Sequence, residues 1–165
     1  MMVRRNCMDE DDLRTDDLVS RYKLEAQESI STEAERRVSQ TIPMKERIRL
    51  RALSLYVLVE RGIESPDLIP ALLERLGPVR AALDGHGGGV AVVSVETGDS
   101  GLEFVLDLTG ACLSCGAAPG TLAGVRSDLE NDLEINSIKF SSALLETFDE
   151  LGREFVLSHG GVEFV

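Results

Sequence analysis

The stretch VAVVSVETGDSGLEFVLDLTGACLSCGAAPGTL, residues 90–122, decides the fold of this chain. Its first part, Val90 to Glu96, is rich in β-branched residues, and Leu102, Phe104, Leu106 and Leu108 then alternate with polar residues. The polar segment from Thr97 to Gly101 separates these two parts, so they predict an antiparallel β-hairpin. A helix from Pro119 to Leu133 and a short third strand from Ile135 to Phe140 are expected to follow.

Two helical segments precede the hairpin. Residues 44–64 are expected to form one amphipathic helix, with Gly62 at its C-terminal end. In this helix the apolar stripe would contain Met44, Ile48, Leu55, Tyr56, Leu58 and Val59, while Lys45, Arg47, Arg49 and Arg51 would form a solvated face. Ser65-Pro66 predicts the start of the next helix, which Gly77-Pro78 should interrupt before Val79 to Leu83 continue it.

The two ends of the chain are expected to be appendages. Residues 1–43 are polar and charged, and we expect Met1 to Asp17 to be disordered and Leu18 to Gln40 to form a loose helix. The extension 141–165 should contain a helix from Ser142 to Leu151. The central domain is thus residues 65–140, of the α/β (α+β) class: a small mixed three-stranded sheet with a β-hairpin packed by two helices, preceded by the extra helix and the flexible leader.

The charge and the hydropathy of the sequence argue against nucleic-acid binding, membrane association and secretion. With 29 acidic and 17 basic residues the formal net charge is -12 at pH 7, which disfavours nucleic acid and anionic membrane surfaces as partners. No apolar run approaches the roughly 20 residues that a membrane-spanning helix needs, and the acidic start lacks the apolar centre of a signal peptide. A cytoplasmic protein is expected.

Cys112 and Cys115 form a Cys-x-x-Cys pair between the second strand and the following helix. At this spacing two sulfurs face one metal centre, and a helix N-terminus favours the thiolate form. The pair alone leaves three interpretations open: metal binding, dithiol-disulfide redox chemistry and a chance pair of buried thiols. A hairpin, rather than a βαβ unit, precedes the pair, which disfavours a thioredoxin-like protein.

The other candidate residues offer little chemistry. Cys7 lies in the leader, far from the pair in sequence, and His86 and His159 are expected to be exposed histidines without a catalytic task. The glycine-rich segment Gly85 to Gly89 lies after a helix and before a strand, the reverse of a dinucleotide-binding motif, and is expected to turn the backbone. Because no catalytic triad or carboxylate pair can be assembled, we expect no enzymatic activity.

Residues from Asp67 to Phe140 resemble the C-terminal domain of the NifU family. The resemblance rests on Gly110-Ala111-Cys112-Leu113-Ser114-Cys115 followed by Thr121-Leu122, and on Val79-Arg80-Ala81-Ala82-Leu83 with Gly87-Gly88 upstream. The chain departs from the family pattern at Ala81 and Gly116, where proline is usual, and at His86 and Gly89, where acidic residues usually flank the glycines. These departures mark it as a divergent member and touch no ligand.

The resemblance implies a [4Fe-4S] cluster scaffold or carrier with Cys112 and Cys115 as the cofactor-binding and metal-ligating residues; a [2Fe-2S] cluster remains open. Such clusters take four thiolates, so two chains would each supply one pair in a cluster-bridged homodimer. The implied partners are a cluster donor and apo iron–sulfur client proteins. The alternatives are a dithiol-disulfide redox protein using the same pair and a structural zinc module.

Overall fold

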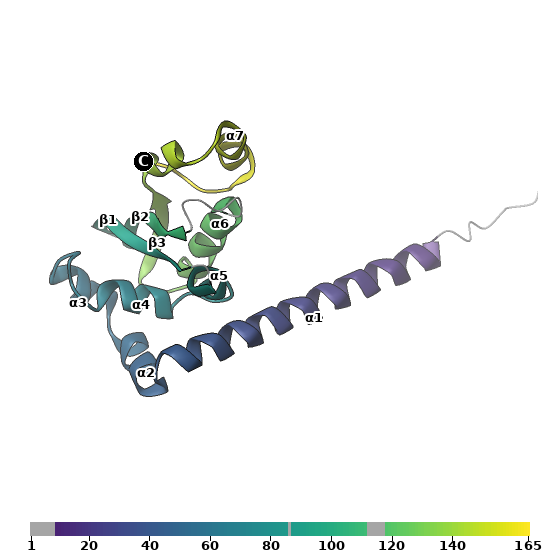
Figure 1. Cartoon of the computed structure of the whole chain (residues 1–165), viewed down its shortest axis with the longest axis horizontal. Coiled ribbons are helices and arrows are strands. Elements are labelled where there is room, and N and C mark those ends of the chain that lie inside the picture. Colours follow the sequence, from purple (N-terminus) through teal and green to yellow (C-terminus); the bar gives the residue numbers. More distant parts are fainter. Residues whose placement is uncertain (1–8, 86, 112–117) are drawn as a thin grey trace, which may run out of the picture.

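A computed structural model of the chain describes residues 9–85, 87–111 and 118–165. At its centre lies a three-stranded mixed sheet in the order β1-β2-β3 (Figure 1), formed by β1 (Gly88–Gly98), β2 (Gly101–Gly110) and β3 (Ile135–Phe140). Strands β1 and β2 form the expected antiparallel hairpin, and β3 pairs with β2 in parallel. The predicted α/β fold with a small mixed sheet is confirmed.

The core lies against β2, the central strand. Its alternating apolar residues Leu102, Phe104, Leu106 and Leu108 are at most 2% exposed. Helices α4 (Leu68–Glu74) and α5 (Val79–Gly85) pack on β1, and α6 (Ala118–Leu129) connects β2 to β3 and packs on β3. A parallel pair needs such a crossover connection, which explains why a helix separates β2 from β3 in sequence.

The segment expected to be one helix, residues 44–64, forms two: α2 (Met44–Ala52) and α3 (Leu55–Glu60). Glu134 binds the chain at the break between these two helices. Its carboxylate accepts a hydrogen bond of 2.6 Å from the Leu55 backbone N–H and one of 2.7 Å from the Ser54 hydroxyl. Glu134, which lies 79 residues after Leu55, thereby caps the N-terminus of α3. Gly62 follows α3 with a φ of 102°, as the sequence predicts for the end of this segment.

The predicted apolar stripe of this segment is wrong in α2. Met44 and Ile48 are exposed, whereas Leu50 and Arg47 are buried. Arg47 therefore does not belong to a solvated basic face. Two leucines of α3, Leu55 and Leu58, are fully buried as expected.

Two other helix boundaries differ from the sequence prediction. Helix α4 begins at Leu68 instead of Ser65-Pro66, and the Ser65 carbonyl accepts a hydrogen bond from the Leu68 N–H. Helix α6 ends at Leu129, because a turn in which Asp132 accepts from the Glu134 N–H leads into β3, so that Leu133 is 99% exposed. The interruption at Gly77-Pro78 before α5 is confirmed.

The C-terminal extension also differs from the expected single helix, Ser142 to Leu151. A 3₁₀ helix, η2 (Ser142–Thr147), precedes α7 (Glu150–His159), whose first turn is capped by the Asp149 carboxylate accepting from the Gly152 N–H. Phe164 then bridges to Phe140 in parallel, with backbone hydrogen bonds from Val165 to Phe140 and from Phe140 to Glu163. The end of the chain therefore adds one isolated bridge at the last residue of β3.

The leader contains a long helix, α1 (Asp9–Thr41), that projects from the domain (Figure 1). It includes the loose helix expected from Leu18 to Gln40, but it begins at Asp9, so the expected disorder up to Asp17 is not found over residues 9–17. Residues 1–8 lie outside the described residues. None of the described helices is both long and apolar enough to cross a membrane.

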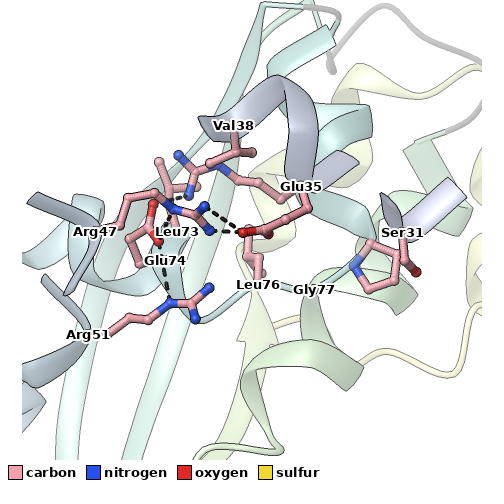
Figure 2. Close-up of a pocket in the computed structure, with 11 residues that line it drawn as sticks. Ser31, Glu35, Val38, Arg47, Arg51, Leu73, Glu74, Leu76 and Gly77 are labelled. Atoms are coloured by element: carbon pink, nitrogen blue, oxygen red, sulfur yellow. Dashed lines mark hydrogen bonds and ion pairs between the residues drawn. The ribbon is translucent and has the colours of Figure 1, made fainter. Parts of the chain in front are cut away.

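A buried carboxylate joins the helices beneath the sheet (Figure 2). Glu74 of α4, whose side chain is 1% exposed, contacts Arg47 of α2 at 3.0 Å, Arg80 of α5 at 3.4 Å and Arg51 at 3.5 Å. Arg47 also donates to Glu35 of α1 at 2.6 Å. This hydrogen bond to Arg47 lowers the pKa of Glu35 and in turn raises the pKa of Arg47. One cluster of charges thus links four helices.

Arg47 and Arg51 provide a matched pair of substitutions at this cluster. Arg47→Ala removes a buried partner and leaves Glu74 poorly compensated, so we expect it to lower the free energy of unfolding by about 3–5 kcal/mol. Arg51→Ala removes a half-exposed side chain at the same carboxylate and should cost at most about 1 kcal/mol. Urea denaturation followed by circular dichroism measures both. Equal losses would mean that burial does not determine the strength of these contacts.

Candidate functional site

The segment that joins β2 to α6 carries the predicted metal-binding pair. Cys112 and Cys115 themselves lie outside the described residues, as do Cys7 and His86. The structure describes both ends of the segment: Gly110 ends β2, Ala111 follows it, and Ala118 begins α6. The site is therefore built from the residues that hold these two ends in place.

The hairpin register brings the glycine-rich turn beside the start of this segment. Gly88 pairs with Gly110, and Gly89 pairs with Thr109. Gly110 has a φ of 67°, and a Cβ atom placed on it would overlap the carbonyl oxygen of Gly87. A Cβ atom on Gly89 would lie 2.9 Å from the Thr109 hydroxyl oxygen. Two glycine elements that are distant in sequence thus form one close backbone junction, with no room for a side chain at Gly110.

The second end of the segment is held by α6. Leu122, Val125 and Leu129 bury the inner face of this helix in the core. Gly124 allows α6 to approach α5 closely, because a Cβ atom there would lie 2.9 Å from a Val79 methyl group. The helix that follows Cys115 is therefore fixed against the domain. Unpaired N–H groups at a helix N-terminus favour negative charge, which includes thiolates and a cluster bound to them.

Sequence reasoning treated Gly85 to Gly89 as a turn only and missed its contact with Gly110. The hairpin carries part of this signal: counting outward from the turn places Gly89 opposite Gly110, and a register shift between Val92 and Ser94 then moves the partner of Gly110 to Gly88. The turn that contains Gly87 and Gly88 therefore contacts Gly110, the last residue of β2 before the cysteine segment.

Of the remaining sequence candidates, the structure describes His159. His159 ends α7 and stacks on Phe155 with a ring separation of 5.3 Å. Within the described ranges, no group of three His, Cys, Asp or Glu side chains is placed to hold a metal ion.

The three arginines of α2 are accounted for by ion pairs. Arg49 contacts both Glu46 and Asp67, and its hydrogen bonds lower the pKa of each of these carboxyl groups. A hollow of about 180 Å³ lies beside Arg47, Arg51 and Arg80, and Glu35 and Glu74 also line it (Figure 2). The three arginines are paired with carboxylates, so this hollow has the character of a structural charge cluster.

Comparison with known families identifies the region around the cysteine segment. Residues 73–138 match the family model described as the NifU-like domain. The match begins in α4, contains the hairpin, the cysteine segment and α6, and ends within β3. No match to the chain was found among curated proteins or among solved structures. Residues 73–138 of this chain are therefore similar to the NifU-like domain.

Proposed function

We propose that this protein is a non-enzymatic iron–sulfur cluster scaffold or carrier, which binds a labile [4Fe-4S] cluster through Cys112 and Cys115 and transfers it to apo-proteins. The observation that carries the proposal is the NifU-like match, since it contains both cysteines. NifU-like domains belong to the iron–sulfur cluster assembly proteins as a class, and that class generally interacts with apo iron–sulfur proteins.

The chemistry of the cysteine pair supports this assignment. Thiolates are the soft ligands that iron–sulfur clusters use, and a cubane cluster takes four of them. Each chain offers two at suitable spacing, so two chains together complete the ligand set. The close backbone junction at Gly87 and Gly110 holds the end of β2 from which the cysteine segment starts.

A cluster shared between two chains suits transfer better than storage. The cluster is then the cargo of the protein, held at a subunit interface instead of within one core. Separation of the two chains removes two ligands at once, which makes release to a client with its own four thiolates favourable.

Metal analysis and visible absorption distinguish this function from its alternatives. Protein purified without oxygen, or reconstituted with iron and sulfide, should be brown and contain iron and sulfide in equal amounts. Colourless protein with bound zinc would favour the structural zinc module. A metal-free dithiol that cycles with its disulfide would favour the redox protein.

Replacing either cysteine of the pair should abolish cluster binding. Cys112→Ser or Cys115→Ser keeps the size of the side chain and removes only the soft ligand, so we expect iron retention below about a tenth of the wild-type value with an unchanged circular dichroism spectrum. Iron content and visible absorption after anaerobic reconstitution measure the effect.

Cys7→Ser is the matched control, since it removes the third cysteine of the chain and should leave iron retention unchanged. Normal iron content in both variants of the pair would refute the assignment. A loss in Cys7→Ser equal to that in Cys112→Ser would add Cys7 to the ligands.

Cluster loading should join chains at one cluster per two copies. Because two thiolates per chain leave a cubane cluster half-ligated, the native mass should double on addition of iron and sulfide and return on chelation. Native mass spectrometry under anaerobic conditions measures mass and iron content together. A full cluster on each chain without a change in mass would contradict the shared site.

The glycine junction gives a further prediction. Gly110→Ala and Gly87→Ala both place a side chain on left-handed backbone, which costs about 1–2 kcal/mol in each variant. Only the new Cβ of Gly110→Ala meets the Gly87 carbonyl, whereas the position at Gly87 is open. We therefore expect Gly110→Ala to lose about 1–3 kcal/mol more stability than Gly87→Ala and to retain several-fold less cluster. Equal behaviour of the two variants would show that the junction has no role.

A further inference from the structure

The base of α1, residues 35–41, packs against the domain although it lies outside the NifU-like match. Val38 is 3% exposed, and α1 packs on α5. By contrast, the residues from Asp17 to Ile30 are exposed, and the helix leaves the domain as a single rod (Figure 1). The described contacts of α1 with the domain are therefore concentrated in its last turns.

One of these contacts reaches the end of α5 directly. The Arg37 guanidinium donates from Nε to Glu33 within α1 at 2.9 Å, and its Nη1 atom lies 3.6 Å from where a Cβ atom of Gly85 would be. Gly85 is the last residue of α5. The carbonyl groups that end a helix favour a nearby cation, so Arg37 supports this end of α5.

A second connection between α1 and α5 passes through the buried Glu74 cluster (Figure 2). Glu35 accepts a hydrogen bond from Arg47 at 2.6 Å, and Arg47 donates to Glu74 at 3.0 Å. Glu74 also accepts from Arg80 of α5 at 3.4 Å, and Arg80 Nε donates to Asp84 at 2.8 Å. This connection ends at the last but one residue of α5, next to the direct contact.

The end of α5 leads into the glycine turn at the candidate site. The Asp84 carbonyl accepts a hydrogen bond of 3.4 Å from the Gly87 N–H. The Gly87 carbonyl oxygen occupies the space beside Gly110 that a Cβ atom there would need. Gly110 ends β2, where the cysteine segment starts. A continuous set of contacts therefore runs from α1 through α5 to the start of that segment.

We infer that the base of α1 supports the end of α5 and, through it, the glycine turn beside Gly110, so that this helix determines how tightly the cluster is bound. The inference rests on the proposed function, because the cluster is bound by the segment that follows Gly110. Arg37 and Glu35 are positioning residues, which act on the cluster through α5. Close-packed elements transmit small displacements, and a site is only as precise as the residues that support it.

The coupling between α1 and the cluster works in both directions. When docking of α1 raises the affinity for the cluster by some factor, cluster binding raises the affinity of α1 for the domain by the same factor. A contact that only stabilised α1 would give no such response to the cluster.

Amide hydrogen exchange tests the support of the glycine turn in the protein without metal. The full chain, in chelator and reductant, is followed by mass spectrometry over residues 87–90. Arg37→Ala removes the contact at Gly85, and Glu35→Gln weakens the charged hydrogen bond to Arg47. Each variant should raise the exchange rate of residues 87–90 several-fold. Exchange in the centre of β2 should not change, because local opening of a turn does not require unfolding of the core.

The helix offers a matched control for each variant. Arg36→Ala is the control for Arg37→Ala, because the Arg36 side chain is 57% exposed against 55% for Arg37 and its hydrogen bonds to Glu33 stay within α1. Glu28→Gln is the control for Glu35→Gln. Glu28 lies seven residues before Glu35 on the same face of α1, about 10 Å further along the helix. Both controls should leave exchange at residues 87–90 unchanged.

The cluster-loaded protein tests the coupling itself. Arg37→Ala and Glu35→Gln should release the cluster to a chelator several-fold faster than their controls, at equal thermal midpoints. Cluster loading should also slow amide exchange at residues 35–41 in the wild-type protein. In Arg37→Ala this protection should be smaller although two chains still share the cluster, which separates coupling from burial by the second chain.

The two states of the protein keep this inference distinct from the proposed function. Equal exchange at residues 87–90 in Arg37→Ala and Arg36→Ala, or equal rates of cluster release, would overturn the inference and leave the cluster assignment intact. A wild-type chain that binds no cluster would refute the proposed function and with it the effect on cluster release. Exchange in the metal-free protein would still decide whether α1 supports the glycine turn.

Discussion

The antiparallel register of β1 and β2 is the constraint on which the other parts of the domain depend. It places Leu102, Phe104, Leu106 and Leu108 together on the buried positions of the central strand. A shift of one residue would turn these four side chains to the opposite face of the sheet. Beyond a one-residue register shift between Val92 and Ser94, the same two strands bring Gly88 to Gly110, so the hairpin that forms the core also places the glycine turn beside the start of the cysteine segment.

The buried Glu74 cluster has a different role, because it connects helices instead of filling the core. Its carboxylate is enclosed by arginines from α2 and α5, and Arg47 extends the network to Glu35 on α1. Buried ion pairs contribute little net stability once desolvation is subtracted, but an unpaired charge is costly. The cluster therefore penalises any arrangement of these helices in which Glu74 loses its arginines, and it ties the base of α1 to the NifU-like domain.

The sequence predicted those elements whose signal is local. The hairpin, the third strand at Ile135–Phe140 and the interruption at Gly77-Pro78 follow from alternation and from glycine and proline chemistry. The break at Leu53-Ser54 and the burial of Arg47 could not be predicted, because both depend on carboxylates far away in sequence, Glu134 and Glu74. For the site, the motif around Cys112 and Cys115 pointed to the family, whereas the Gly87–Gly110 contact required the register of two strands.

The cap that Glu134 provides to α3 also bears on the order in which the chain acquires its structure. Leu55 and Glu134 are separated by 79 positions, and the cap can form only when the turn before β3 has reached the start of α3. The hydrogen bonds that separate α2 from α3 therefore belong to the long-range contacts of the domain, whose closure costs more chain entropy than the local contacts of residues 44–60.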